Sequence, residues 1–258
     1  MYRPIIAGLW LMMLVSIPLL AADAETLAQR EEAAHDEYRA LLDRGLETSS
    51  RVPVAEFRDA FDRHFRGYLQ QHISEFSEAE LLQLHDAVGT LLFYAQDAEM
   101  ARFMADLSNE IERRFPQATV EHLEKTYKYL VASRLFTLAT DFADMHRAKL
   151  DTPVFDVHDD VDTSLGLPSL FVVRSMNGVV TLTRNAVPVG KGNWVIVESE
   201  PRCYFSRKFL EYLESNEVLK EKFATQSLWL MRQGSTLPLQ PVLEWNEESA
   251  FVDLTISY

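Results

Sequence analysis

The stretch Val195–Leu210 reads VIVESEPRCYFSRKFL and contains the only cysteine of the 258 residues, Cys203. Its apolar, β-branched start predicts a buried strand, Pro201 marks a short turn, and the residues after the cysteine have helical spacing. Cys203 is therefore expected where a strand ends and a helix begins. A thiol at that position faces unpaired backbone amides, which favour the charged thiolate.

Charged neighbours act on this thiol in both directions. Arg202 and Arg207 favour the thiolate, whereas Glu198 and Glu200 oppose it. A single cysteine cannot form an internal disulfide. The thiol of Cys203 is therefore either buried and inert or available to another molecule.

Strand patterns surround this stretch. β-branched and aromatic residues predict strands at 170–173, 179–182, 194–197, 227–231 and 251–258. Helices are expected over about 206–222 and again up to residue 249. Residues 171–258 are thus expected to form an α/β domain.

The preceding part, residues 25–150, has a helical pattern throughout. Helices are expected over 25–46, 54–72, 78–95, 97–115, 119–132 and 134–149. Ser77 and Glu80 have the form of a capping box. The segments 100–107 and 138–145 match at a shift of 38 residues, with alanines that permit close helix packing. Two interpretations stay open, tetratricopeptide-like helix pairs or an ordinary helical bundle.

Residues 151–170 are rich in proline, glycine and acidic residues, which predicts an acidic linker. Asp160, Asp162 and Ser164 begin like a calcium-binding loop. The later glycine and glutamate that such a loop requires are replaced by Leu165 and Phe171, so no metal site is expected here.

Composition and motifs exclude several function classes. With 39 acidic and 25 basic residues the net charge is -14, which repels nucleic acid. The seven histidines lack zinc-ligand spacing, and the stretch 190–192 lacks the rest of a nucleotide-binding loop. The sequence therefore predicts no metal, no cofactor and no nucleic-acid partner.

Residues 1–24 predict a secretory signal peptide. Arg3 precedes an apolar run from 5 to 21, and Ala22 and Ala24 form a small-residue cleavage site. The alternative is an uncleaved membrane anchor, which would be the one expected contact with a membrane. In either case the protein is expected to be exported, periplasmic or secreted.

The segment Cys203–Ser206 resembles the active site of the thioredoxin-like family, a Cys-x-x-Cys at the end of a central strand and the first turn of the next helix. Here serine takes the place of the second cysteine, and Arg202 stands where the family has an aromatic residue. The family also has a cis-proline opposite the cysteine and further closing strands. After residue 231 these are not evident, so either the fold is abbreviated or the sequence ends before them.

The helical pattern and the resemblance together predict an α+β protein, with an all-helical N-terminal domain over residues 25–150. The resemblance implies that a thioredoxin-like domain follows over residues 171–258. It further implies monothiol exchange through Cys203, or isomerase-like capture of substrate cysteines, with Ser206 bonding the thiolate. Because serine cannot resolve a mixed disulfide, such adducts await an external thiol, and other exported proteins are the expected partners. The alternative is a non-catalytic protein-binding module with a vestigial thioredoxin-like fold.

Overall fold

The computed structural model describes residues 26–69, 73–117, 120–152, 154–159, 161, 168–187, 193–231 and 237–257. The predicted signal segment 1–24, the residues Asp160, Asp162 and Ser164, and the stretch 190–192 lie outside these ranges. Within the described part of the chain, no helix is both long and apolar enough to cross a bilayer.

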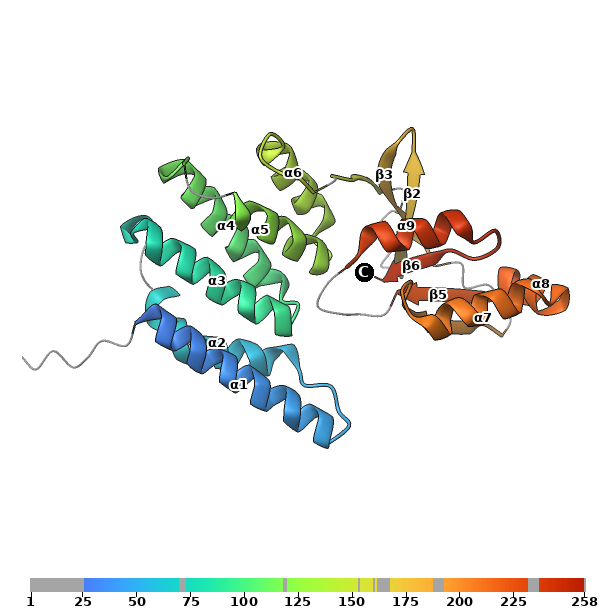
Figure 1. Cartoon of the computed structure of the whole chain (residues 1–258), viewed down its shortest axis with the longest axis horizontal. Helices are drawn as coiled ribbons and strands as arrows, with labels where there is room; N and C mark the ends of the chain where they lie inside the picture. Colours follow the sequence, from blue (N-terminus) through green and yellow to red (C-terminus); the bar gives the residue numbers. More distant parts are fainter. Residues whose placement is uncertain are drawn as a thin grey trace, which may run out of the picture.

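The first part of the chain is an array of paired helices (Figure 1). Its elements are α1 (Leu27–Glu47), α2 (Val54–Leu69), the short 3-10 helix η1 (Ile73–Glu75), α3 (Glu78–Tyr94), α4 (Ala98–Arg114), α5 (Glu121–Ala132) and α6 (Phe136–His146). Helix α1 packs against α2, α3 against α4 and α5 against α6, and the pairs meet through α1 with α3 and α4 with α5. The expected helices are confirmed, with ends that differ by a few residues.

The two matching sequence segments lie in α4 and α6, the second helices of successive pairs. Three of the matched pairs are buried in both helices: Ala101 with Ala139, Met104 with Phe142, and Ala105 with Ala143. Met145, which matches the buried Leu107, is 68 % exposed. The buried alanines let neighbouring helices approach closely. The two helices thus use these three matched positions in the same way, while kinship with tetratricopeptide repeats stays a prediction.

The helix termini follow the local sequence. The amide of Glu80 donates to Ser77 Oγ at 3.3 Å and the amide of Ser77 donates to Glu80 Oε2 at 2.8 Å, which confirms the predicted capping box of α3. Hydrogen bonds from the hydroxyl and the amide of Ser77 lower the pKa of Glu80. The box thus satisfies the amides of Ser77 and Glu80 at the start of α3.

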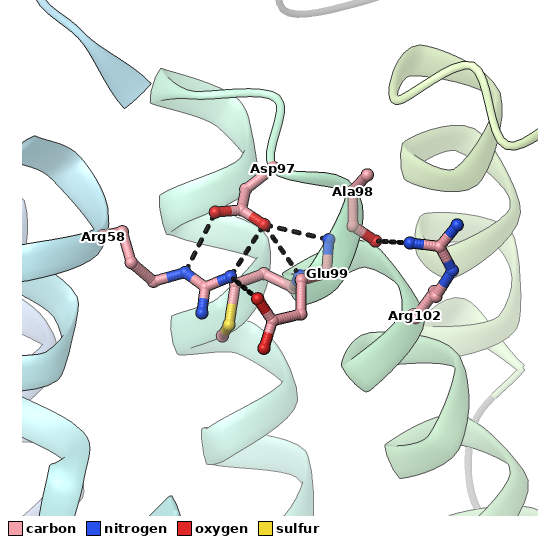
Figure 2. A network of polar contacts seen from close by, with 6 residues as sticks. Arg58, Asp97, Ala98, Glu99 and Arg102 are labelled. Atoms are coloured by element: carbon pink, nitrogen blue, oxygen red, sulfur yellow. Dashed lines mark hydrogen bonds and ion pairs between the residues drawn. The ribbon is translucent and has the colours of Figure 1, made fainter. Parts of the chain in front are cut away.

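The cap of α4 is part of a charged network that sequence reasoning missed (Figure 2). Asp97 Oδ1 accepts hydrogen bonds from the amides of Glu99 and Met100 at 2.9 and 3.0 Å. The guanidinium of Arg58 in α2 donates to both carboxylate oxygens of Asp97 at 2.9 Å and to Glu99 at 2.9 Å. Burial opposes the positive charge of Arg58, yet its hydrogen bond to Asp97 leaves its pKa raised. One carboxylate therefore caps α4 and ties it to α2.

The second part of the chain is a mixed sheet with helices. Its strands are β1 (Asp156–Asp159), β2 (Ser169–Met176), β3 (Val179–Ala186), β4 (Val195–Ser199), β5 (Ser227–Met231) and β6 (Leu254–Ser257), in the order β1-β3-β2-β6-β5-β4. Its helices are α7 (Tyr204–Glu214), α8 (Glu217–Gln226) and α9 (Leu239–Glu248). The five predicted strands and the mixed α/β character are confirmed.

Strand directions divide the sheet into two halves. β2 and β3 form an antiparallel hairpin, whose two-residue turn has positive φ at Asn177 (54°) and Gly178 (79°), as a type I′ turn requires. β4, β5 and β6 run parallel, with α7 and α8 connecting the first two and α9 the last two. β6 pairs antiparallel with β2 and joins the halves.

Two expectations differ from the structure. The single helix expected over 206–222 is split, because Asn216 caps the start of α8 by accepting a hydrogen bond from the amide of Leu219 at 3.1 Å. The segment predicted as an acidic linker contains β1, which pairs parallel with β3. It also contains Phe155, which is only 1 % exposed. Part of this segment is therefore built into the fold.

Phe155 lies where the helical array meets the sheet. Its ring is 5.9 Å from that of Tyr127 in α5 and 6.0 Å from that of Phe136 in α6. Phe136 in turn contacts Phe171 of β2, with ring centroids 4.7 Å apart. The buried side chains of both parts belong to one continuous apolar cluster. The two parts of the chain thus share a core.

Candidate functional site

Cys203 occupies the place that its sequence neighbourhood predicts. Strand β4 ends at Ser199, the turn Glu200–Arg202 follows, and the amide of Cys203 donates to the carbonyl oxygen of Glu200 at 3.0 Å. Cys203 is then the N-cap of α7, with an extended backbone (φ -74°, ψ 124°). Its side chain is partly exposed to solvent. The thiol therefore sits at a helix N-terminus and is accessible.

The environment favours the ionised thiol. The neutral thiol makes no capping hydrogen bond to α7. The pKa of Cys203 is nevertheless lowered, because the backbone amides of Ser206 and Phe205 and the hydroxyl of Ser206 stabilise the thiolate. The nearby charge of Glu200 acts in the opposite direction. The net effect is a thiol that ionises more readily than a free cysteine.

Ser206 lies one helical turn after the cysteine, and its hydroxyl faces the same turn. The amide of Glu200 donates to Ser206 Oγ at 3.4 Å, so the hydroxyl contacts the backbone before the cysteine, and it is one of the groups that lower the pKa of Cys203. Sequence reasoning paired Cys203 with Ser206, and the structure brings them together. Ser206 supplies a hydrogen bond but no second thiol.

The two arginines predicted to favour the thiolate differ in their contacts, and the predicted role of Arg202 stays a prediction. Arg202 is exposed in the turn. The guanidinium of Arg207 donates to the carbonyl oxygen of Pro201 at 2.8 Å, pairs with Glu248 and lies 5.0 Å from the ring centroid of Trp245. Arg207 thus fastens the start of α7 to α9. Hydrogen bonds at the helix N-terminus account for the lowered thiol pKa.

Exposed aromatic rings flank the thiol. Tyr204 is 66 % and Phe205 79 % exposed, and their ring centroids are 5.7 Å apart. On the buried side of the same helix lie Leu210 and Leu213. Two aromatic residues on the outward side of an amphipathic helix were visible in the sequence, yet they were not assigned to the site. They form an apolar surface beside Cys203.

The position of β4 departs from the thioredoxin-like expectation. β4 lies at one edge of the described sheet and pairs with β5, whereas the resemblance places the cysteine after a central strand. The described residues also contain no cis peptide bond. The agreement is therefore local, in the strand, turn, cysteine and helix.

A second polar cluster is buried within the helical array. His85 Nε2 lies 2.8 Å from Thr126 Oγ1, which lies 2.7 Å from Ser108 Oγ. The ring of His122 meets that of His85 edge-on at 5.9 Å. His85 is 1 % exposed, and burial lowers its pKa, while the carboxylate of Asp86, 3.9 Å from Nδ1, opposes the shift. This histidine is neutral in the folded protein at neutral pH.

We expect the cluster to make stability depend on pH. The unfolded chain protonates His85 below about pH 6.5, and the folded chain resists this, so the free energy of unfolding falls as the pH drops below that value. For one such group, the free energy of unfolding falls by up to about 1.4 kcal/mol per pH unit. Urea unfolding at pH 7.5 and at pH 5.5 measures this difference in the free energy of unfolding.

Two variants test the assignment to this histidine. His85→Gln should reduce the dependence on pH. Thr126→Val removes the hydrogen-bond partner without removing a titrating group, so it should lower stability by a similar amount at both pH values. An unchanged dependence in His85→Gln would contradict the assignment.

The described residues contain no group of three or more His, Cys, Asp or Glu side chains arranged to hold a metal ion. Comparison with protein families, curated proteins and solved structures gives no match to this chain.

Proposed function

We propose that this chain is an exported, thioredoxin-like protein that performs monothiol exchange through Cys203. The observation that carries the proposal is the accessible thiol at the N-terminus of α7, with a pKa lowered by the amides of Ser206 and Phe205 and by the Ser206 hydroxyl. A thiolate is the nucleophile in disulfide exchange, and a lowered pKa increases the fraction of Cys203 that is ionised at a given pH.

The proposed reaction forms one sulfur–sulfur bond and breaks another. The Cys203 thiolate attacks a disulfide of a substrate protein, a mixed disulfide forms, and the displaced substrate thiolate leaves and takes a proton from water. Ser206 cannot attack the adduct, so a thiol of the substrate or of a second molecule releases Cys203. The class of reaction is therefore capture and exchange rather than dithiol oxidation or reduction.

The exposed rings of Tyr204 and Phe205 suit a protein substrate. They offer exposed apolar contact area on the two residues that follow Cys203, where a polypeptide carrying the disulfide would bind. Together with the predicted signal segment, this favours other exported proteins as partners. The local strand, turn and helix support the thioredoxin-like assignment, and the edge position of β4 weighs against it.

A second function is favoured by a different observation. The helix pairs α1–α2, α3–α4 and α5–α6 form an array of the kind that binds other proteins (Figure 1). In this alternative the chain is a non-catalytic binding module, and Cys203 has no chemical role. The two functions differ in whether Cys203 is needed.

The rate of alkylation of Cys203 separates the functions. The rate of reaction with iodoacetamide is measured as a function of pH. We expect the midpoint of this pH profile to lie below the ordinary thiol pKa of about 8.5. Ser206→Ala should move the midpoint upward, because one hydrogen bond to the thiolate is lost, whereas Arg202→Ala should change it little. Cys203→Ser, which has no thiol, measures the background reaction. A midpoint at or above the ordinary value would remove the monothiol proposal and leave the binding module.

Trapping of adducts gives an independent readout. Acid-quenched wild-type protein should carry disulfide-linked partners that reductant releases, and Cys203→Ser should carry none. Ser206 cannot resolve the adduct. The fraction of Cys203 trapped in adducts should therefore be the same in the wild type and in Ser206→Ala, at a pH where Cys203 is ionised in both proteins. Equal recovery of partners from Cys203→Ser would show that they bind without the thiol.

A further inference from the structure

A cavity of about 410 Å³ lies where the helical array meets the sheet. It is walled by Tyr127, Tyr129 and Val131 of α5, by Phe155, by Val180 of β3 and by the segment Leu237–Pro241 that leads into α9. It lies outside the surroundings of Cys203 described above. Aromatic, aliphatic and proline side chains supply most of its lining, as in small-molecule sites.

The charged groups at this cavity are already paired. Lys125 Nζ lies 2.9 Å from Asp86 Oδ1, and Lys128 Nζ lies 3.9 Å from Glu124 Oε2. Each lysine is therefore matched by a carboxylate, and the chain as a whole carries a net charge of -14. An anionic ligand would meet no uncompensated positive charge and would be repelled at long range.

Two further polar side chains of the lining, besides the tyrosines, point to the same ligand chemistry. Gln240 donates to Glu244 at 3.2 Å, and the hydroxyl of Thr152 donates to Glu124. Their hydrogen bonds are made within the protein. A ligand bearing a formal charge would lose its hydration without replacement, whereas an apolar ligand loses little.

The volume sets the size of the ligand. An apolar cavity of about 150 Å³ is sufficient to bind benzene. The cavity here is more than twice as large, so it accommodates a fused or linked pair of rings. The rings of Tyr127, Tyr129 and Phe155 supply aromatic partners for such a molecule.

We propose that this cavity binds a neutral aromatic small molecule of about two rings, held between α5, β3 and the start of α9. Its walls come from both parts of the chain, so binding also strengthens their junction. The site is independent of the proposed thiol chemistry.

A matched pair of fluorescent probes tests the charge and the size. N-phenyl-1-naphthylamine is neutral, and 8-anilinonaphthalene-1-sulfonate has the same ring system with one added sulfonate. We expect saturable binding of one neutral probe per chain, about tenfold or more tighter than the anionic one. The neutral probe should also raise the melting temperature of the protein, and the increase should grow with the fraction of cavities occupied. Tighter binding of the anionic probe, or binding that does not saturate, would overturn the proposal.

Filling the cavity locates the bound probe. Val180→Trp places a large ring in it from β3, and Leu239→Trp does so from the first residue of α9; both positions are half-buried, and either variant that folds suffices. Each should abolish binding of the neutral probe.

A matched control examines the other apolar surface. Phe205→Ala removes the exposed ring beside Cys203 and should leave probe affinity unchanged. If it abolished binding while the cavity-filling variants retained it, the probe would reside on that surface and the cavity proposal would be wrong. Alkylation of Cys203 should be the same in the two cavity-filling variants as in the wild type.

Discussion

Replacing Phe155 by alanine should lower the free energy of unfolding by about 3 to 5 kcal/mol. Phe155 is 1 % exposed and its ring contacts those of Tyr127 and Phe136, so the substitution removes buried contacts on both helices. It also enlarges the 410 Å³ cavity that the ring borders, and the loss of packing around an unfilled space adds to the transfer cost. Urea unfolding followed by circular dichroism measures the change.

A surface ring provides the control. Phe93 is 53 % exposed, and Phe93→Ala should change stability by less than about 0.5 kcal/mol. We also expect the wild type to unfold in one transition, since the helical array and the sheet share a core. If residues 151–170 were a free linker, Phe155→Ala would cost little and the two parts would unfold separately.

Replacing Asp97 by alanine should lower the free energy of unfolding by about 2 to 3 kcal/mol. The substitution removes the cap of α4, which contributes about 1 kcal/mol. It also removes the bidentate hydrogen bond between the guanidinium of Arg58 and the carboxylate of Asp97. Arg58 keeps its ion pair with the exposed Glu99. The side chains of Arg58 and Asp97 are 22 % and 13 % exposed, so water compensates only part of that loss.

Matched variants divide the effect of Asp97 into its components. Asp97→Asn retains an oxygen that can cap the helix but loses the charge, so about half of the loss should remain. Glu99 is 81 % exposed, and Glu99→Gln should change stability by less than about 0.5 kcal/mol. An equal loss in the asparagine and alanine variants would assign the whole effect to the ion pair.

Local patterns predicted the elements well. Amphipathic periodicity gave the helices α1 to α6, and the capping box at Ser77 located the start of α3. β1 was missed because Asp156–Asp159 is short and acidic, and edge strands tolerate charged residues that a buried strand would not. The split between α7 and α8 was missed because Asn216 interrupts a pattern that otherwise continues as a helix.

The candidate site was predicted in part. The change from strand to helix located Cys203 at an N-terminus, and the spacing to Ser206 brought the hydroxyl into the same turn. The orientation of Arg207 toward Pro201, Glu248 and Trp245 was not predictable, because α9 follows it by more than thirty residues.

The sequence alone determined which residues form helices and which form strands, because propensity, periodicity and capping act over a few neighbouring residues. It likewise determined that the single thiol begins a helix. Only the tertiary structure decided the edge position of β4, the pairing of Arg58 with Asp97, the burial of Phe155 and the cavity at the junction. Each of these features joins segments distant along the chain, and the same local elements are compatible with several such arrangements until their side chains pack against one another.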